Sequence, residues 1–155
     1  MAIASPGATL RDEQQLIASI VEMMKQEQQL LVSADADGLA ALTPEKLKLA
    51  QKAAELSRIR HKALGAAGFP AVEAGMEPWL ALGGNDAVRA DWDRLLELAR
   101  QAKELNRVNG MLVNKQLAQT TGTLNAIRGD SPAGGVYGAS GQTLSAGPSR
   151  RFVVG

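Results

Sequence analysis

Apolar residues recur every three or four positions in long stretches of the chain, the spacing of one face of an α-helix. The first stretch covers residues 10–32, and Thr9 just before it is a candidate N-cap. The second covers 43–64 and opens with Thr43-Pro44-Glu45, where threonine can cap a helix and proline suits its first position. These patterns predict helices over 10–32 and 43–64.

A third periodic stretch runs from Asp86 to Arg128 and contains no proline. Asn85 or Asp86 can cap it, and its main stripe is apolar in the first half and polar in the second. Residues 69–85, which precede it, mix prolines and glycines with aromatic side chains, as in a packed connection with a short helix. We expect a third helix over 86–128 that outlasts the other two, and a connection that covers one end of the bundle.

The last segment has a different composition. Residues 129–155 are rich in Gly, Ser and Pro, and such a segment buries too little apolar area to offset its ordering entropy. The sequence therefore predicts an all-α fold, an antiparallel helical bundle or coiled coil of three main helices. We expect a helical domain over 1–128 and a flexible tail over 129–155.

Composition and charge exclude several classes of function. The 155 residues include no cysteine and a single histidine, which rules out disulfide frameworks, thiolate metal sites and multi-histidine sites. A formal net charge of +1 argues against a protein that binds nucleic acid by neutralising phosphates. The N-terminus lacks the pattern of a signal peptide, and no apolar run could span a membrane. We expect a cytoplasmic protein with no membrane insertion.

Motifs for catalysis, metals or cofactors are absent from the sequence, so we expect neither an enzyme nor a cofactor. Glu97 and Glu104 stand among basic residues at helical spacing and are expected to form solvated ion pairs. His61 is followed by Gly65, as in histidine phosphotransfer domains, but Leu64 stands where those domains carry a lysine. Phosphotransfer through His61 is therefore a minor alternative.

A polar seam runs along the third predicted helix and contains Asn106, Asn109 and Gln116. Such residues can fix the register of a homodimeric coiled coil, or they can form hydrogen bonds with the helix of another protein. The spacing alone leaves both open. A structural adaptor that only homodimerises is the chief alternative to a binding protein.

The segment Glu104-Leu-Asn106-Arg-Val-Asn109-Gly110-Met-Leu112-Val resembles the Asn-x-x-Asn-Gly-x-Leu segment in the long third helix of the FlgN family of flagellar export chaperones. The similarity extends to the Gln- and Leu-rich stretch 26–31, the Asp-Ala-Asp link 35–37, the basic second helix and the tail motif 137–141.

This resemblance implies a cytoplasmic chaperone of type III flagellar export that binds the C-terminal amphipathic helices of the hook-associated proteins FlgK and FlgL. It would prevent their premature assembly and deliver them to the export gate, where Tyr137 would engage the cytoplasmic domain of FlhA. Carried over by position, the partner-binding residues are Asn106, Asn109, Gly110, Leu112, Val113, Gln116, Leu117, Thr120, Leu124 and Ile127.

Overall fold

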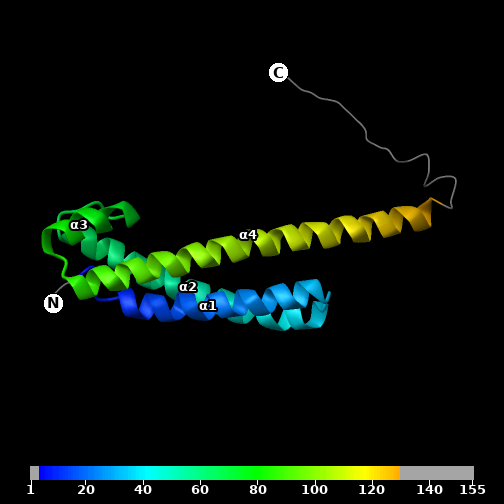
Figure 1. Ribbon diagram of the computed structural model, residues 1–155, viewed down its shortest axis with the longest axis horizontal. Helices are drawn as coiled ribbons and strands as arrows, with labels where there is room; N and C mark the ends of the chain where they lie inside the picture. Colours follow the sequence, from blue (N-terminus) through cyan, green and yellow to red (C-terminus); the bar gives the residue numbers. More distant parts are fainter. Residues whose placement is uncertain (1–3, 130–155) are drawn as a thin grey trace, which may run out of the picture. The chain divides into compact units, whose positions relative to one another are not determined.

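The computed structural model describes residues 4–129 and contains helices but no strand within that range (Figure 1). The helices are α1 (Leu10–Val32), α2 (Ala36–Ala66), α3 (Met76–Gly83) and α4 (Asp86–Arg128), and the short 3₁₀ helix η1 (Glu73–Gly75) precedes α3. The all-α fold class is confirmed. Residues 130–155, with Tyr137 and most of the predicted tail, lie outside the described residues, so the division at residue 128 stays a prediction.

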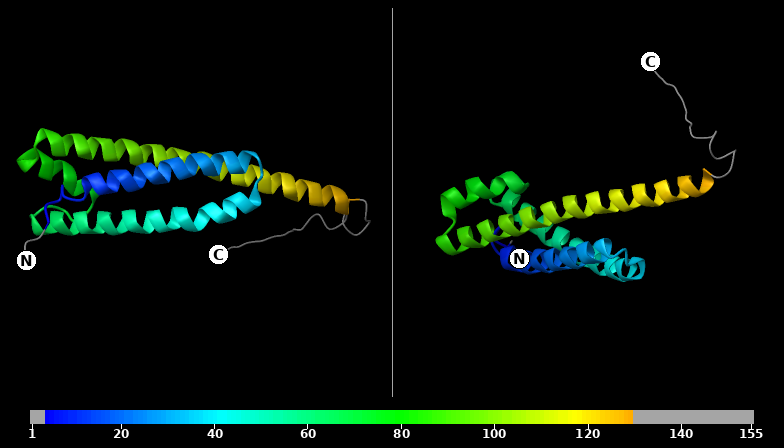
Figure 2. Two further views of the ribbon diagram at one scale, coloured as in Figure 1. Left: turned by 90° about the horizontal axis from the view of Figure 1, so that it is seen from below. Right: turned by 45° about the vertical axis from the view of Figure 1, so that its right-hand side comes forward.

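The chain divides into two units, one that ends at Leu112 and one that begins at Val113. In the first unit α1 and α2 form an antiparallel hairpin, and the first part of α4 runs alongside them (Figures 1 and 2). The connection through η1 and α3 covers one end of this bundle, as the sequence predicts. The described part of the second unit is the remainder of α4, from Val113 onward.

Helices α1 and α4 span the residues that the hydrophobic pattern predicts, but the prediction for the second helix is wrong at its start. Helix α2 begins at Ala36 rather than residue 43, because the carboxylate of Asp35 accepts a hydrogen bond of 2.8 Å from the backbone N–H of Gly38. Thr43 is inside the helix, where its hydroxyl donates to the carbonyl of Leu39. Pro44 removes one helical hydrogen bond on an exposed turn, where water can replace it.

Caps were also expected at the starts of α4 and α1, and only the one before α4 is confirmed. The side-chain oxygen of Asn85 accepts a hydrogen bond of 2.9 Å from the N–H of Val88, so Asn85 caps α4. Thr9 precedes α1, but its hydroxyl caps no backbone group and instead donates to the carboxylate of Glu13 at 2.7 Å. The capping role predicted for Thr9 is therefore wrong, because a buried carboxylate takes the hydroxyl.

The apolar core of the first unit has two parts. At the end covered by α3, the buried residues come from all four helices, and partly buried aromatic side chains pack against them: Leu10, Leu64, Met76, Leu80, Trp92 and Leu95, with Phe69 and Trp79. Toward the other end, a second cluster contains Ile20, Met24 and Ala53, with Leu49, Ala102 and Leu105 beside it. Burial of these side chains is the main term that holds the three long helices together.

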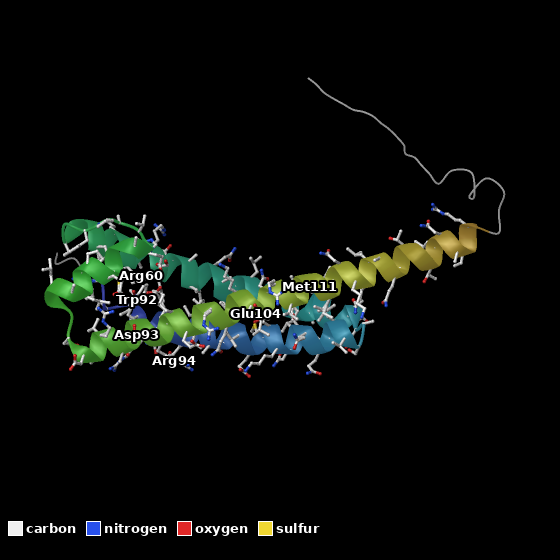
Figure 3. All side chains as sticks on the ribbon, turned by 45° about the horizontal axis from the view of Figure 1, so that its top comes forward. Arg60, Trp92, Asp93, Arg94, Glu104 and Met111 are labelled. Carbon is white, nitrogen blue, oxygen red and sulfur yellow. The ribbon has the colours of Figure 1, made fainter. Side chains whose placement is uncertain are left out.

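A buried ion pair crosses the first cluster. Nε and Nη2 of Arg60 on α2 donate to the carboxylate of Glu13 on α1 at 2.9 and 3.0 Å, and the two side chains are 2% and 4% exposed. The guanidinium lies 5.0 Å from the ring centroid of Trp92, next to it in Figure 3. Burial alone would lower the pKa of Arg60, but its hydrogen bonds and charge interactions with Glu13 and Glu73 raise it, so Arg60 stays charged.

A second polar contact holds α4 against α1. The side-chain nitrogen of Asn109 donates to the backbone carbonyl of Met24 at 2.9 Å and to the carboxylate of Glu27 at 2.8 Å. Lys46 on α2 pairs with the same carboxylate at 2.6 Å. Asn109 is 3% exposed, so these bonds form where water does not compete. Three helices therefore meet at one polar network.

We predict that Glu13→Ala lowers the free energy of unfolding by about 3–5 kcal/mol, because it leaves the charge of Arg60 buried without its main partner. Urea unfolding of the full chain, followed by circular dichroism, measures the loss. The matched control is Arg11→Ala, which breaks the exposed pair with Asp91 and should cost about 0–1 kcal/mol. Equal losses for the two variants would contradict a structural role for the buried pair.

We also predict that Asn109→Ala costs about 1–3 kcal/mol of unfolding free energy, because it removes the buried hydrogen bonds to the carbonyl of Met24 and to the carboxylate of Glu27. Asn106→Ala, three residues away on the exposed side of the same helix, should change the stability by less than about 0.5 kcal/mol. The same urea titration compares them. An Asn106 variant as unstable as the Asn109 variant would show that the contact to Met24 is not what stabilises α4.

Candidate functional site

The ten predicted partner-binding residues all lie on α4 but fall in both units. Asn106, Asn109, Gly110 and Leu112 belong to the first, and the other six belong to the second. Asn109 is buried and bonded within the chain, whereas Leu112 and Gln116 are half-buried. The exposed members are Asn106, Gly110, Val113, Leu117, Thr120, Leu124 and Ile127.

An exposed row of side chains follows α4 through the second unit. Its members are separated by four, three, four and three residues, which places them on one face of the helix at the spacing of a coiled-coil core. We call this face the apolar row, and it consists of Val113, Leu117, Thr120, Leu124 and Ile127. Its four aliphatic side chains are 40–65% exposed. Apolar residues at these positions of a soluble helix are typical of a binding surface for another helix.

The two parts of α4 differ in their charges. Before residue 113 the helix carries ion pairs on its surface, including Glu97 with Arg100 and Glu104 with Arg107. Their hydrogen bonds to Arg100 and Arg107 hold the pKa values of Glu97 and Glu104 below the ordinary range. Both pairs follow the pattern predicted for a solvated helix face. Residues 113–128 contain no acidic residue, and Lys115 and Arg128 are their two basic residues.

His61 is held by a carboxylate. Its Nε2 lies 2.6 Å from Oε1 of Glu73, and the same oxygen accepts a hydrogen bond from Arg60. The ring nitrogen of His61 is therefore already engaged by a carboxylate. The arrangement ties α2 to η1, which is a structural use of the histidine.

A cavity of about 300 Å³ lies within the first unit and is mainly apolar. Its wall includes Ile17, Leu95 and small residues of α2 and α4, together with the bonded groups of Glu13 and Arg60. These polar groups bond to each other, and Arg60 also donates to the hydroxyl of Ser57 in the same wall at 3.5 Å. Among residues 4–129, no cluster of carboxylates and histidine has the arrangement of a metal site.

The sequence patterns did not identify Arg60 and Asn109, the two polar residues that position α4. Nothing in the local pattern distinguishes Arg60 from its basic neighbours, and the seam that contains Asn109 is predicted to face a helix of a second copy or of another protein. Their true partners, Glu13 and Met24, lie 47 and 85 residues away along the chain. Periodicity within one helix carries no information on such partners. The helical spacing of Asn109 from Trp92, Leu95 and Ala102 does indicate a core-facing position.

Comparison with known proteins places the chain in a family. The family model described as FlgN protein matches residues 1–145. No curated protein and no solved structure matches the chain. Across residues 4–129, no helix has the length and hydropathy that crossing a bilayer requires. With 145 of its 155 residues covered, the chain belongs to the FlgN family of flagellar export chaperones.

Proposed function

We propose that this chaperone binds the C-terminal amphipathic helices of the hook-associated proteins FlgK and FlgL. The observation that supports the proposal best is the apolar row, which exposes four aliphatic side chains in a chain of the FlgN family. A client helix that packs on this row would bury its own apolar face and thereby be kept from assembling before export. The protein would act in the cytoplasm, as part of type III export.

The proposed surface is narrower than the one expected from the sequence. Asn109 is committed to Met24 and Glu27, so we assign it to the positioning of α4 and not to client contact. Asn106 and Gly110 are exposed on the part of α4 that belongs to the first unit, and Leu112 beside them is half-buried. These three residues would extend the contact beyond the apolar row, together with Gln116.

Binding through the apolar row predicts a specific loss. Replacing Leu117 and Leu124 together by serine removes two aliphatic side chains, each worth roughly 1–2 kcal/mol when buried by a partner. We expect the Kd for a labelled peptide of the FlgK or FlgL C-terminal helix to rise at least about tenfold, measured by fluorescence anisotropy.

The matched control for this experiment is Leu47→Ser on α2, because Leu47 is 56% exposed and Leu117 is 59% exposed. This control should leave the Kd unchanged. If the double variant binds as tightly as the unaltered chain, the apolar row is not the client surface. A homodimeric adaptor would instead sediment as a tight dimer and bind no client peptide.

Delivery to the export gate is proposed to use Tyr137, which lies outside the described residues. Tyr137→Ala should leave the Kd for the client peptide unchanged and weaken the binding of the chaperone–client complex to the cytoplasmic domain of FlhA at least about tenfold, because aromatic side chains dominate docking energies. Biolayer interferometry with immobilised FlhA domain measures this. Phe152→Ala is the control in the same segment, and an equal loss in both variants would contradict a specific role for Tyr137.

A further inference from the structure

The residues beside the apolar row are almost all uncharged. If Val113, Leu117, Thr120, Leu124 and Ile127 occupy the core positions of a coiled-coil pattern, the flanking positions are Asn114, Gln116, Thr121, Thr123 and Arg128. All of these except the half-buried Gln116 are exposed. Flanking positions normally choose the partner through ion pairs between the two helices. Arg128, at the end of the helix, is the one charge among the five.

The other charged residue in 113–128, Lys115, lies away from the apolar row. Lys115 stands two residues before Leu117 and two after Val113, on the side of the helix away from the apolar row. The earlier part of α4 shows that this helix can carry charged pairs, since Arg100 and Arg107 form them with Glu97 and Glu104. The neutrality of residues 113–128 is therefore a property of this segment and not of α4 as a whole.

We infer that residues 113–128 select a client helix whose positions beside its own apolar face are uncharged, and bind it by apolar contact and neutral hydrogen bonds instead of ion pairs. This inference rests on the proposed function. A helix with acidic or basic flanks would have to desolvate those charges against threonine and asparagine, which offer no counter-charge. Neutral flanks lose less on binding, because hydroxyl and amide groups can satisfy one another.

A second copy of the chain is the competing occupant, because neutral flanks are also self-complementary. The apolar row covers only about two heptads, fewer than the three to four over which coiled-coil pairing is normally sustained. Thr120 occupies its central position and places a hydroxyl where a self-paired core would need an aliphatic side chain. These two features favour a client that brings a more apolar face than the chain itself has.

The inference predicts that binding hardly depends on salt. The full chain is titrated with a labelled peptide of the FlgK or FlgL C-terminal helix in about 0.1 M and about 1 M NaCl, between which the Debye length falls from about 10 Å to about 3 Å. We expect the two Kd values to agree within about twofold, since no ion pair is screened. A Kd that rises tenfold or more in high salt would overturn the inference while leaving client binding intact.

A charge variant tests the flanks directly. Thr121→Glu should weaken binding of an otherwise neutral-flanked peptide at least about threefold, and a peptide with lysines at its flanking positions should recover this loss in low salt only. Ala126→Glu, which is also at an exposed position but on the side of the helix away from the apolar row, is the control and should change neither Kd. If the unaltered chain binds the lysine peptide more tightly than the neutral-flanked peptide, the flanking residues do not select an uncharged client helix and the inference fails.

Two further outcomes separate the inference from the proposed function. If no client peptide binds at either salt concentration, both the proposed function and the inference fail. If sedimentation shows a dimer of the unaltered chain that dissociates when Leu117 and Leu124 are replaced by serine, a second copy occupies the face and the client-selective interpretation is overturned.

Discussion

Arg60 joins four elements of the first unit through one buried guanidinium. It bonds to Glu13 on α1 and to Glu73 in η1, and it lies against the ring of Trp92 on α4. The indole N–H of Trp92 in turn donates to Glu77 on α3. A buried charge of this kind is costly unless every partner is in place, so the elements around it are held to one arrangement. The end of the bundle that α3 covers thus depends on polar contacts as well as on the burial of apolar side chains.

Helix α4 changes its role within a few residues. Up to Asn109 its inward side chains pack in the core or form hydrogen bonds to α1. From Val113 its aliphatic side chains are exposed, and the chain provides no ion pairs there in the described part. Asn109 and Leu117 illustrate the change, because Asn109 is buried and bonded while Leu117 is 59% exposed. One uninterrupted helix can therefore be anchored in one segment and offered to a partner in another.

A chaperone that carries an exposed apolar surface must avoid binding to itself. Threonine, asparagine and glutamine surround the apolar row and keep its contiguous apolar area small. Hydroxyl and amide groups can donate and accept hydrogen bonds when a partner covers them. The same composition also gives a helix of modest intrinsic stability, since threonine and glycine are poor helix formers. Contact with a client helix would then stabilise this segment as well as the client.

The sequence by itself determined the all-α class, the bounds of α1 and α4, the exposed Leu117, Leu124 and Ile127, and the resemblance to the FlgN family. These follow from helical spacing and from motifs a few residues long, which are local properties. Only the tertiary structure decided that Arg60 and Asn109 are buried, because their partners lie 47 and 85 residues away. It also decided that α2 begins at Ala36, because the hydrogen bond from Gly38 to Asp35 starts the helix ahead of the Thr43-Pro44-Glu45 signal.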